Sequence, residues 1–223
     1  PNPKAAPVFK RVGYVHLADC VRRARVVRHA RYLARRVPRA IAIMAAPFVD
    51  AAVALRDRVR AAGDAKLAAS WHDRIGSEVD ALWQRTKPTS GVVAVRDREF
   101  LAWRFERGPL PAVRYLLLHA RDGELAAWFA TTREDGVLQV RDFWSRAGIA
   151  GMERACVDAL LRAARRDGVE AVSVAVAGPD ERLAGWIATG FRERGRRPVF
   201  GRWRNGASVD ATGLHLTSAD EDE

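Results

Sequence analysis

The residues best placed for chemistry surround a glycine-containing loop that reads Arg146-Ala147-Gly148-Ile149-Ala150-Gly151. Asp142 stands just before this loop, at the end of a predicted strand, and supplies a carboxylate. A helix is predicted after the loop, and the first turn of a helix presents free backbone N–H groups and the positive end of the helix dipole. Together with Arg146, this connection offers an anion a resting place.

A second group of candidates, Trp103, Arg104 and Phe105, lies on a predicted short helix. Two aromatic rings around an arginine are suited to line a groove for an acceptor molecule, or to fill a core with an ion pair at its edge. His119 lies within an apolar strand, which favours a core or edge histidine over a catalytic one. The sequence shows no Ser/His/Asp set, no paired carboxylates and no phosphate-binding P-loop.

The two cysteines, Cys20 and Cys156, are too few and too far apart for a disulfide framework, so a reducing compartment is favoured. They cannot form a metal cluster by themselves, and we expect no metal cofactor. The most apolar stretch, residues 40–49, is well short of the roughly 20 residues that a membrane span requires. The sequence shows no signal-peptide layout either. We therefore expect no membrane span and a cytoplasmic location.

The positive charge of the chain is concentrated at its start. Residues 1–60 hold 14 basic and three acidic residues, and their net charge of +11 equals that of the whole 223-residue chain. A basic segment suits nucleic acid, an anionic membrane surface or an acidic ligand. No zinc-finger spacing or RNA-binding aromatic motif accompanies it, and a composition rich in arginine and alanine explains it more simply. We therefore do not expect tight nucleic-acid binding.

The first part of the chain predicts helices. Residues 20–39 resemble a basic amphipathic helix that ends at Pro38, and a second helix is predicted over residues 48–60. The apolar residues of the first helix, which follow one another at spacings of four, three and four, are Val26, Ala30, Leu33 and Val37. Ser77–Asp80 has the pattern of a capping box ahead of a third helix, and residues 87–91 form a break.

The remainder of the chain alternates strands and helices. Asp97 is predicted to cap a short helix, and residues 115–120, 125–132 and 137–144 form an antiparallel meander with Asp-Gly turns. A helix over 152–167, a strand over 172–176, a helix capped by Asp180 and a strand over 197–203 follow. This order predicts an α/β (α+β) fold in which helices flank a central mixed sheet with an antiparallel meander.

The element order resembles the GNAT superfamily of acyl-CoA N-acyltransferases. It resembles more closely the tandem GNAT-like proteins of bacterial polysaccharide and cell-envelope biosynthesis, which are related to Fem-type transferases. The phrases that carry the resemblance extend over nearly the whole chain: Pro1-Asn2, Val12-Gly13-Tyr14, Val95-Arg96-Asp97, Leu101-Ala102-Trp103-Arg104-Phe105, Arg141-Asp142, Thr189-Gly190-Phe191 and Leu216–Asp222.

The resemblance also implies a domain organisation. A short phrase occurs twice in the chain. The first copy begins with Pro1-Asn2 and ends with Gly13-Tyr14, and the second begins with Gly178-Pro179-Asp180 and ends with Gly190-Phe191. Residues 1–45 are therefore interpreted as the end of a truncated first GNAT-like domain plus a basic helical linker. Residues 46–209 would form the second GNAT-like domain, and residues 210–223 an acidic tail. The first domain would be a missing N-terminal partner.

In GNAT enzymes the acyl-CoA pyrophosphate sits on a Gln/Arg-x-x-Gly-x-Gly/Ala loop at the start of a helix. The resemblance places acyl-CoA on Arg146, Gly148 and Gly151, with Phe143 and Trp144 beside them on the strand. Ile149 stands where the pattern has its middle glycine, and its side chain would block the phosphate. The resemblance also makes Asp142 the general base, and Trp103, Arg104 and Phe105 acceptor-binding residues. No tyrosine follows Tyr115, so the usual thiol acid is missing.

The function implied is transfer of an acyl group from acetyl-CoA or another acyl-CoA to an amine, on a sugar or cell-envelope precursor. A small-molecule amine would be the acceptor. Two alternatives stay open: a non-catalytic GNAT-like domain that binds the acceptor or pairs with a missing catalytic half, and a nucleic-acid-contacting or tRNA-dependent module that uses Arg22–Arg39. Because of Ile149, we expect weak acetyl-CoA binding or none.

Overall fold

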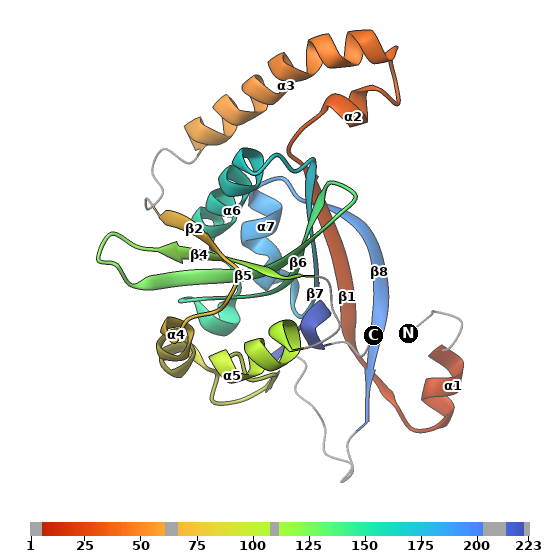
Figure 1. Cartoon of the computed structure of the whole chain (residues 1–223). Helices are drawn as coiled ribbons and strands as arrows, with labels where there is room; N and C mark the ends of the chain where they lie inside the picture. Colours follow the sequence, from red (N-terminus) through yellow and green to blue (C-terminus); the bar gives the residue numbers. More distant parts are fainter. Residues whose placement is uncertain (1–5, 61–66, 108–111, 203–212, 221–223) are drawn as a thin grey trace.

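The computed structural model describes residues 6–60, 67–107, 112–202 and 213–220 (Figure 1). In these residues a nine-stranded mixed sheet has the strand order β2-β4-β5-β6-β7-β1-β8, and β9 pairs with both β7 and β3. Helices flank the sheet, so the predicted α/β fold class is confirmed. No helix in the described ranges is long and apolar enough to cross a membrane.

The predicted meander is confirmed. Strands β4 (Arg114–His119), β5 (Leu125–Glu134) and β6 (Val137–Ser145) pair antiparallel in sequence order. Gly123 in the first turn has a positive φ of 84°, which a glycine adopts without strain. An edge strand that the sequence did not predict, β2 (Ala68–His72), pairs antiparallel with β4.

The helix and strands after the meander are also present. Helix α6 (Arg154–Arg166) connects β6 to β7 (Ala171–Ala177), and these two strands run parallel. The buried face of α6, which includes Cys156 and Leu160, packs on the main core. A short turn of helix, η4 (Asp180–Leu183), and α7 (Ala184–Ala188) then lead to β8 (Arg192–Gly201).

The helix predicted over residues 20–39 is wrong. After the short helix α1 (Ala6–Arg11), the chain forms a long strand, β1 (Val15–Val26), between β7 and β8. Backbone pairing with β8 along most of β1, and with β7 over Cys20–Val26, outweighs the helical spacing of the apolar residues, because pairing and burial in a sheet decide a strand more than local pattern does. Within the predicted range, the helical residues are α2 (Ala30–Leu33) and Arg39, the first residue of the next helix.

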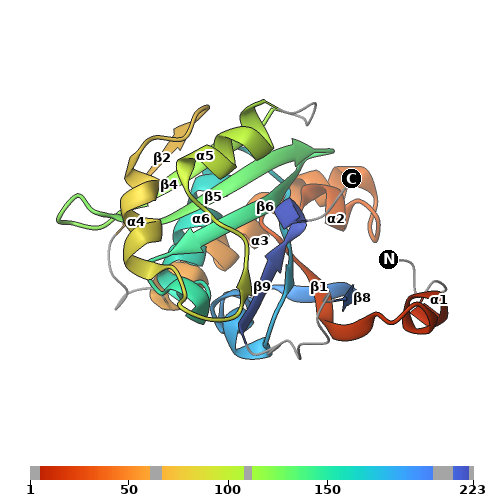
Figure 2. The same ribbon diagram turned by 90° about the horizontal axis from the view of Figure 1, so that it is seen from below.

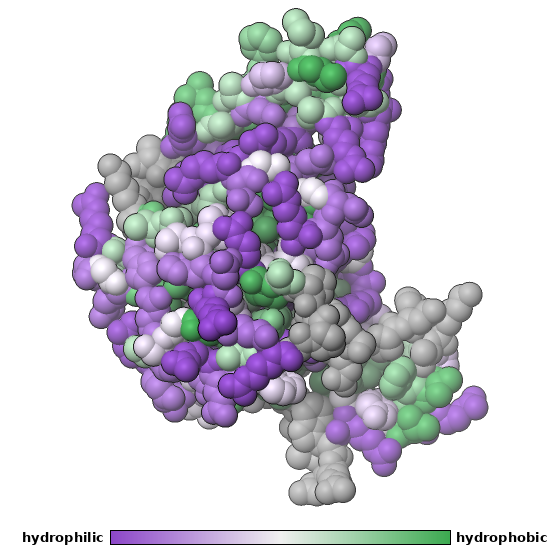
Figure 3. Space-filling model, viewed as in Figure 1, coloured by the Kyte–Doolittle hydropathy of each residue, from purple (hydrophilic) through white to green (hydrophobic). Residues whose placement is uncertain are grey.

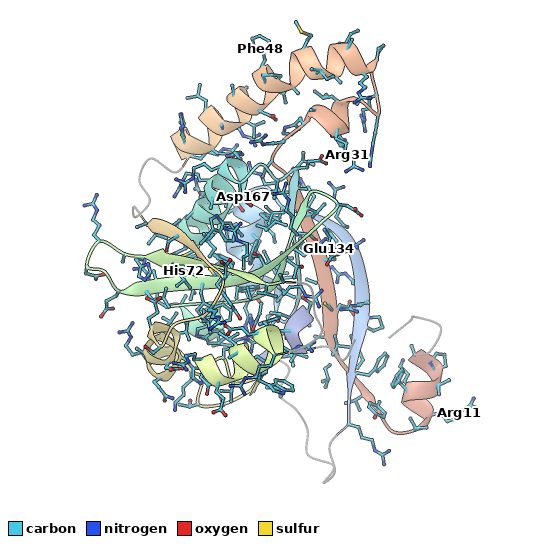
Figure 4. All side chains as sticks on the ribbon, viewed as in Figure 1. Arg11, Arg31, Phe48, His72, Glu134 and Asp167 are labelled. Atoms are coloured by element: carbon cyan, nitrogen blue, oxygen red, sulfur yellow. The ribbon has the colours of Figure 1, made fainter. Side chains whose placement is uncertain are left out.

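Helix α3 (Arg39–Arg60) contains the predicted helix over residues 48–60 and begins nine residues earlier. It lies outside the sheet layers, beside α2 (Figure 1). Its inward face buries Ala42 and Ala46, whereas apolar side chains cover its outward face (Figure 3). Phe48, which points away from the body of the protein in Figure 4, is 76% exposed.

Three short helical segments cover the face of β4 and β5 that lies opposite α6: α4 (Glu78–Thr86), α5 (Arg98–Leu101) and a π-helical turn, η2 (Ala102–Glu106) (Figure 2). The predicted cap of α5 is confirmed, because the Asp97 side chain accepts a hydrogen bond from the Phe100 N–H at 2.9 Å. The capping box predicted at Ser77 is wrong, since the Ser77 side chain makes no cap hydrogen bond to α4. Residues 87–91, the predicted break, form no helix or strand, and the two-residue strand β3 (Val92–Val93) follows them.

Near the end of the chain, β9 (Leu214–Thr217) and a helical turn, η6 (Ser218–Asp220), pack into the protein. They fall within the range interpreted as an acidic tail, and β1 falls within the range interpreted as a first domain and linker. Both flanks of residues 46–209 therefore contribute strands to the sheet. The domain boundaries themselves stay predictions.

Candidate functional site

The candidate site is a crevice between two parallel strands. Strands β6 and β7 pair over four residues each, from Val137 with Ala171 to Val140 with Val174. Beyond this point they separate, and β9 takes the place of β6 beside β7, where Val176 lies opposite Thr217. Ligands of open α/β sheets bind outside the carboxyl ends of such strands. In this protein residues 213–220 occupy the crevice (Figure 2).

An ion-pair network holds these residues in place. The Arg96 side chain donates from Nε to Asp142 Oδ1 at 3.1 Å and from Nη2 to Asp220 Oδ2 at 2.7 Å. The Thr217 hydroxyl donates to the same Asp142 oxygen at 2.9 Å. Arg96 and Asp142 are fully buried and Asp220 is nearly so, and the network therefore joins β6 to the end of the described chain.

The burial of Asp142 changes its chemistry. Burial raises the pKa of its carboxyl to about 6, the charge of Arg96 opposes this rise, and the charge of Asp220 adds to it. Asp142 Oδ2 has no hydrogen-bond partner among the described residues. A general base must reach the proton that it removes. With Thr217 and Arg96 around it, Asp142 is sealed from solvent, and its role as a base stays a prediction.

Aromatic rings close the crevice around His215. The His215 ring lies edge-on to Phe143 and Trp144, with ring centroids 5.3 Å and 5.4 Å away. Burial, followed by the charges of Arg96 and Arg182, holds the pKa of His215 well below its ordinary value. The imidazole is therefore neutral and acts as an aromatic filler in this conformation. Arg182 also donates a hydrogen bond to the Leu214 carbonyl, which fixes the other end of β9.

The glycine loop folds into a turn of 3-10 helix, η3 (Gly148–Ala150), and uses several of its own N–H groups. The Arg146 N–H bonds to the Ala126 carbonyl at 2.8 Å, and the Ala147 N–H bonds to Ser145 Oγ at 3.2 Å. The N–H groups of Ala150 and Gly151 bond to carbonyls within the turn. Four of the six N–H groups of residues 146–151 are therefore already bonded within the protein.

The glycines of this loop serve packing. Gly148 and Gly151 have positive φ angles of 55° and 104°, and a Cβ on either would collide with a backbone oxygen, of Thr86 and Arg182 respectively. The close approach that glycine allows is therefore already taken by protein atoms. Ile149 is half-buried and packs against the core beneath α4. It belongs to this turn, and its part in blocking a phosphate stays a prediction.

Arg146 forms an exposed ion pair with Glu153. Its Nε donates to Glu153 Oε2 at 3.1 Å, and Glu153 stands at the N-cap of α6. A carboxylate at a helix N-terminus supplies the negative charge that the helix dipole favours. Glu153 therefore places a carboxylate at the start of α6, beside the loop. The loop and the filled crevice do not fit an acyl-CoA in this conformation.

Four of the nine predicted site residues, Asp142, Phe143, Trp144 and Arg104, contact residues 213–220. Phe143 and Trp144 contact His215, and the Arg104 Nε donates to the Ala219 carbonyl at 2.8 Å. Phe105 is buried in the core beneath α4, whereas Trp103 is 59% exposed. Arg146, Gly148 and Gly151 lie in the neighbouring loop.

Sequence reasoning missed the partners that close the crevice: Arg96, Thr217, His215 and Asp220. Arg96 and Asp220 lie within two of the phrases that carried the family resemblance, which was the available signal. Among the described residues, no group of three or more histidine, cysteine, aspartate or glutamate side chains is placed to hold a metal ion.

No family model and no curated protein matches the sequence. Solved structures share the fold. A conserved protein of unknown function from Enterococcus faecalis, described as a probable N-acyltransferase, matches 89% of this chain and 42% of its own at 11% identity, with a TM-score of 0.52. A GCN5-related N-acetyltransferase from Sphaerobacter thermophilus matches 88% of this chain and 55% of its own at 11% identity, with a TM-score of 0.47.

The chain thus spans about half the length of the solved structures that it matches. At 11% identity, the similarity to the Enterococcus faecalis structure establishes the overall fold alone. The Fem-related subfamily and a preceding domain remain predictions.

Proposed function

We propose that the protein takes part in acyl-CoA-dependent N-acylation of an amine on a sugar or cell-envelope precursor. Within this reaction, the described unit binds the acceptor or pairs with a catalytic unit and does not itself hold the acyl-CoA. The GNAT-like fold supports the reaction class. The observation that carries the division of roles is the position of residues 213–220 between β6 and β7.

A second candidate is that this unit is itself the acyltransferase. The parallel pair β6 and β7, with a glycine loop and a helix between them, favours this candidate. It requires that residues 213–220 leave the crevice and that Arg146 exchange Glu153 for the pyrophosphate. Asp142 would then become available as a base. Acetyl-CoA or another acyl-CoA would be the co-substrate.

The nucleic-acid alternative is less favoured, because arginines of the basic segment make contacts within the protein. Arg25 donates to Asp57 Oδ2 at 2.6 Å, and Arg28 donates to the Arg165 carbonyl at 2.9 Å. Arg31 lies 3.4 Å from Glu170. These contacts hold β1 and α2 to the rest of the protein.

Calorimetry with acetyl-CoA, together with an assay of CoA thiol release in the presence of glucosamine, separates the two candidates. We expect no binding and no thiol release above the rate without protein. The variants Glu153→Gln and Ile149→Gly should also fail to bind, because residues 213–220 still fill the crevice. Micromolar binding by the unmodified chain that is lost in Arg146→Gln would support the acyltransferase candidate instead.

A further inference from the structure

Helix α3 carries five large apolar side chains that are each more than half exposed: Ile41, Met44, Phe48, Leu55 and Val59. They follow one another at spacings of three, four, seven and four residues, which place them on one side of the helix over about five turns. Figure 3 shows apolar residues gathered along this helix at the edge of the molecule, and Phe48 points away from the body in Figure 4. A continuous exposed patch of this kind, termed the α3 stripe below, marks an interaction site.

The opposite face of α3 holds the helix to the protein. Asp50 accepts a hydrogen bond from the His29 N–H at 3.0 Å. Asp57 Oδ2 lies 2.6 Å from Arg25 on β1 and 2.5 Å from Arg165 on α6. Both carboxylates of the helix therefore face inward and are paired there. The α3 stripe takes no part in these contacts.

The charge around the α3 stripe is positive. Residues 30–60 hold seven arginines, and their two acidic residues are the inward-facing Asp50 and Asp57. All seven arginines are exposed. Arg56 lies 3.7 Å from Asp57, which two other arginines already neutralise. The arginines nearest the stripe gather at its two ends: Arg35, Arg36 and Arg39 before its start, and Arg56, Arg58 and Arg60 around its end.

This distribution of charge opposes pairing with a second copy of the chain. A two-fold contact sets the same surface against itself. Whether two copies of α3 packed parallel or antiparallel, the arginines at the ends of one stripe would meet those of the other, and like charges facing one another are costly. A nucleic acid would match the arginines and leave the apolar side chains uncovered.

An anionic lipid surface matches both features. Apolar side chains of a helix that lies in the plane of a membrane enter the boundary between headgroups and acyl chains. Arginines beside such a stripe extend their long side chains to the headgroups and are attracted by anionic lipids. The stripe and the arginines at its ends have this arrangement on α3.

We propose that the outward face of α3 docks the protein on an anionic phospholipid surface. The α3 stripe enters the headgroup boundary, and the arginines at its ends bind lipid phosphates. The helix lies flat on the surface and does not span it, because its inward face is bonded to β1 and α6 through Asp57. Docking of this kind requires neither acyl-CoA nor an open crevice.

Flotation of the full chain with lipid vesicles tests this docking. We expect the protein to float with vesicles that contain phosphatidylglycerol, and not with vesicles of phosphatidylcholine alone. Added salt should release the protein, because it screens the attraction between arginine and lipid phosphate.

Variants locate the docking face. Leu55→Glu should weaken vesicle binding about tenfold or more, since a charge replaces an inserted apolar group. The matched control is Val8→Glu, because Val8 is 61% exposed and Leu55 62%, and α1 lies at the opposite end of the molecule from α3 (Figure 1). Arg58→Gln should weaken binding about fivefold. Arg121→Gln, at the β4–β5 turn, removes the same charge elsewhere and should have little effect.

Docking on an anionic surface is overturned if the unmodified chain floats with neither kind of vesicle or equally with both. It is also overturned if Val8→Glu releases the protein as readily as Leu55→Glu does. Light scattering tests the other occupant, since a dimer that Leu55→Glu converts to a monomer would assign the α3 stripe to a second copy. Circular dichroism verifies that each variant is folded.

Discussion

Arg96 is the residue on which the closed crevice depends most. It is fully buried, bonds to Asp142 and Asp220, and also donates from Nη1 to the Ala94 carbonyl at 2.9 Å. Two carboxylates thus share one guanidinium in a setting where an uncompensated charge is costly. The residue serves the stability of the closed form and has no access to a ligand in it.

We predict that Arg96→Met lowers the free energy of unfolding by about 3–5 kcal/mol, because two buried carboxylates lose their counter-ion. Urea denaturation measures this change. The matched control is Arg85→Met, which breaks an exposed pair with Glu124 at 3.3 Å and should cost less than about 1 kcal/mol. Equal effects of the two substitutions would contradict the role given to Arg96.

Asp142 predicts a dependence of stability on pH. Its folded pKa of about 6 lies above the ordinary value of 3.8. Between these two values the folded protein holds more protons at this site than the unfolded chain, so the contribution of Asp142 to stability falls as pH rises through that window.

Asp142→Asn removes this titration. Measured by urea denaturation, the free energy of unfolding of the unmodified protein should fall relative to that of the variant as pH rises from about 4 to 6, by at most roughly 3 kcal/mol. Above this window the difference should become constant. A difference that is flat, or that moves in favour of the unmodified protein, would show that the Asp142 carboxyl is ionised throughout.

At the residue scale, local contacts could be predicted and distant ones could not. The cap of Asp97 on the Phe100 N–H spans three residues and follows from sequence pattern. The pair Arg96 and Asp220 spans 124 residues, and only the folded sheet brings the two together. The loop glycines were located correctly, but their collision partners, Thr86 and Arg182, come from other elements.

At the element scale, the meander was predictable because Asp-Gly turns separate its apolar strands, and α6 was predictable because its apolar residues recur at helix spacing. β1 was not predictable in this way, because arginines interrupt its apolar pattern. Arg25 is buried within the strand and pairs with Asp57 of α3. A strand whose charged residues find partners on a distant helix carries a misleading local pattern.

The two faces of helix α3 differ in exposure, and one substitution on each face tests this difference. Phe48 on the outward face is exposed, whereas Ala46 on the inward face is 3% exposed. Phe48→Glu should change the free energy of unfolding by no more than about 0.5 kcal/mol. Ala46→Glu buries a charge against the body of the protein and should lower it by about 2 kcal/mol or more. Similar losses in thermal or urea denaturation for both variants would contradict this placement of the helix.

At the scale of the whole molecule, the fold pairs part of the positive charge of residues 1–60 with acidic residues from the rest of the chain. Arginines of the first 60 residues meet carboxylates supplied by later elements, as in the pairs Arg31 with Glu170 and Arg23 with Glu193. Part of the remaining charge surrounds the α3 stripe. Composition alone could not show this pairing, because it depends on β1 lying between β7 and β8.

Residues 213–220 fill the crevice in which an acyl-CoA would have to lie. Their backbone is paired to β7 and β3, and the Thr217 N–H donates to Asp220 Oδ2 at 2.8 Å. Amides held in this way exchange with solvent only when the segment opens. Displacement by a ligand would therefore be visible as a loss of protection.

Hydrogen exchange of residues 213–220, measured with and without millimolar acetyl-CoA, tests this claim most directly. The account predicts that the segment is protected in the free protein and that acetyl-CoA leaves its exchange unchanged. Faster exchange of this segment on addition of acetyl-CoA, saturating at micromolar concentrations, would contradict the account and show that the crevice opens for the acyl-CoA.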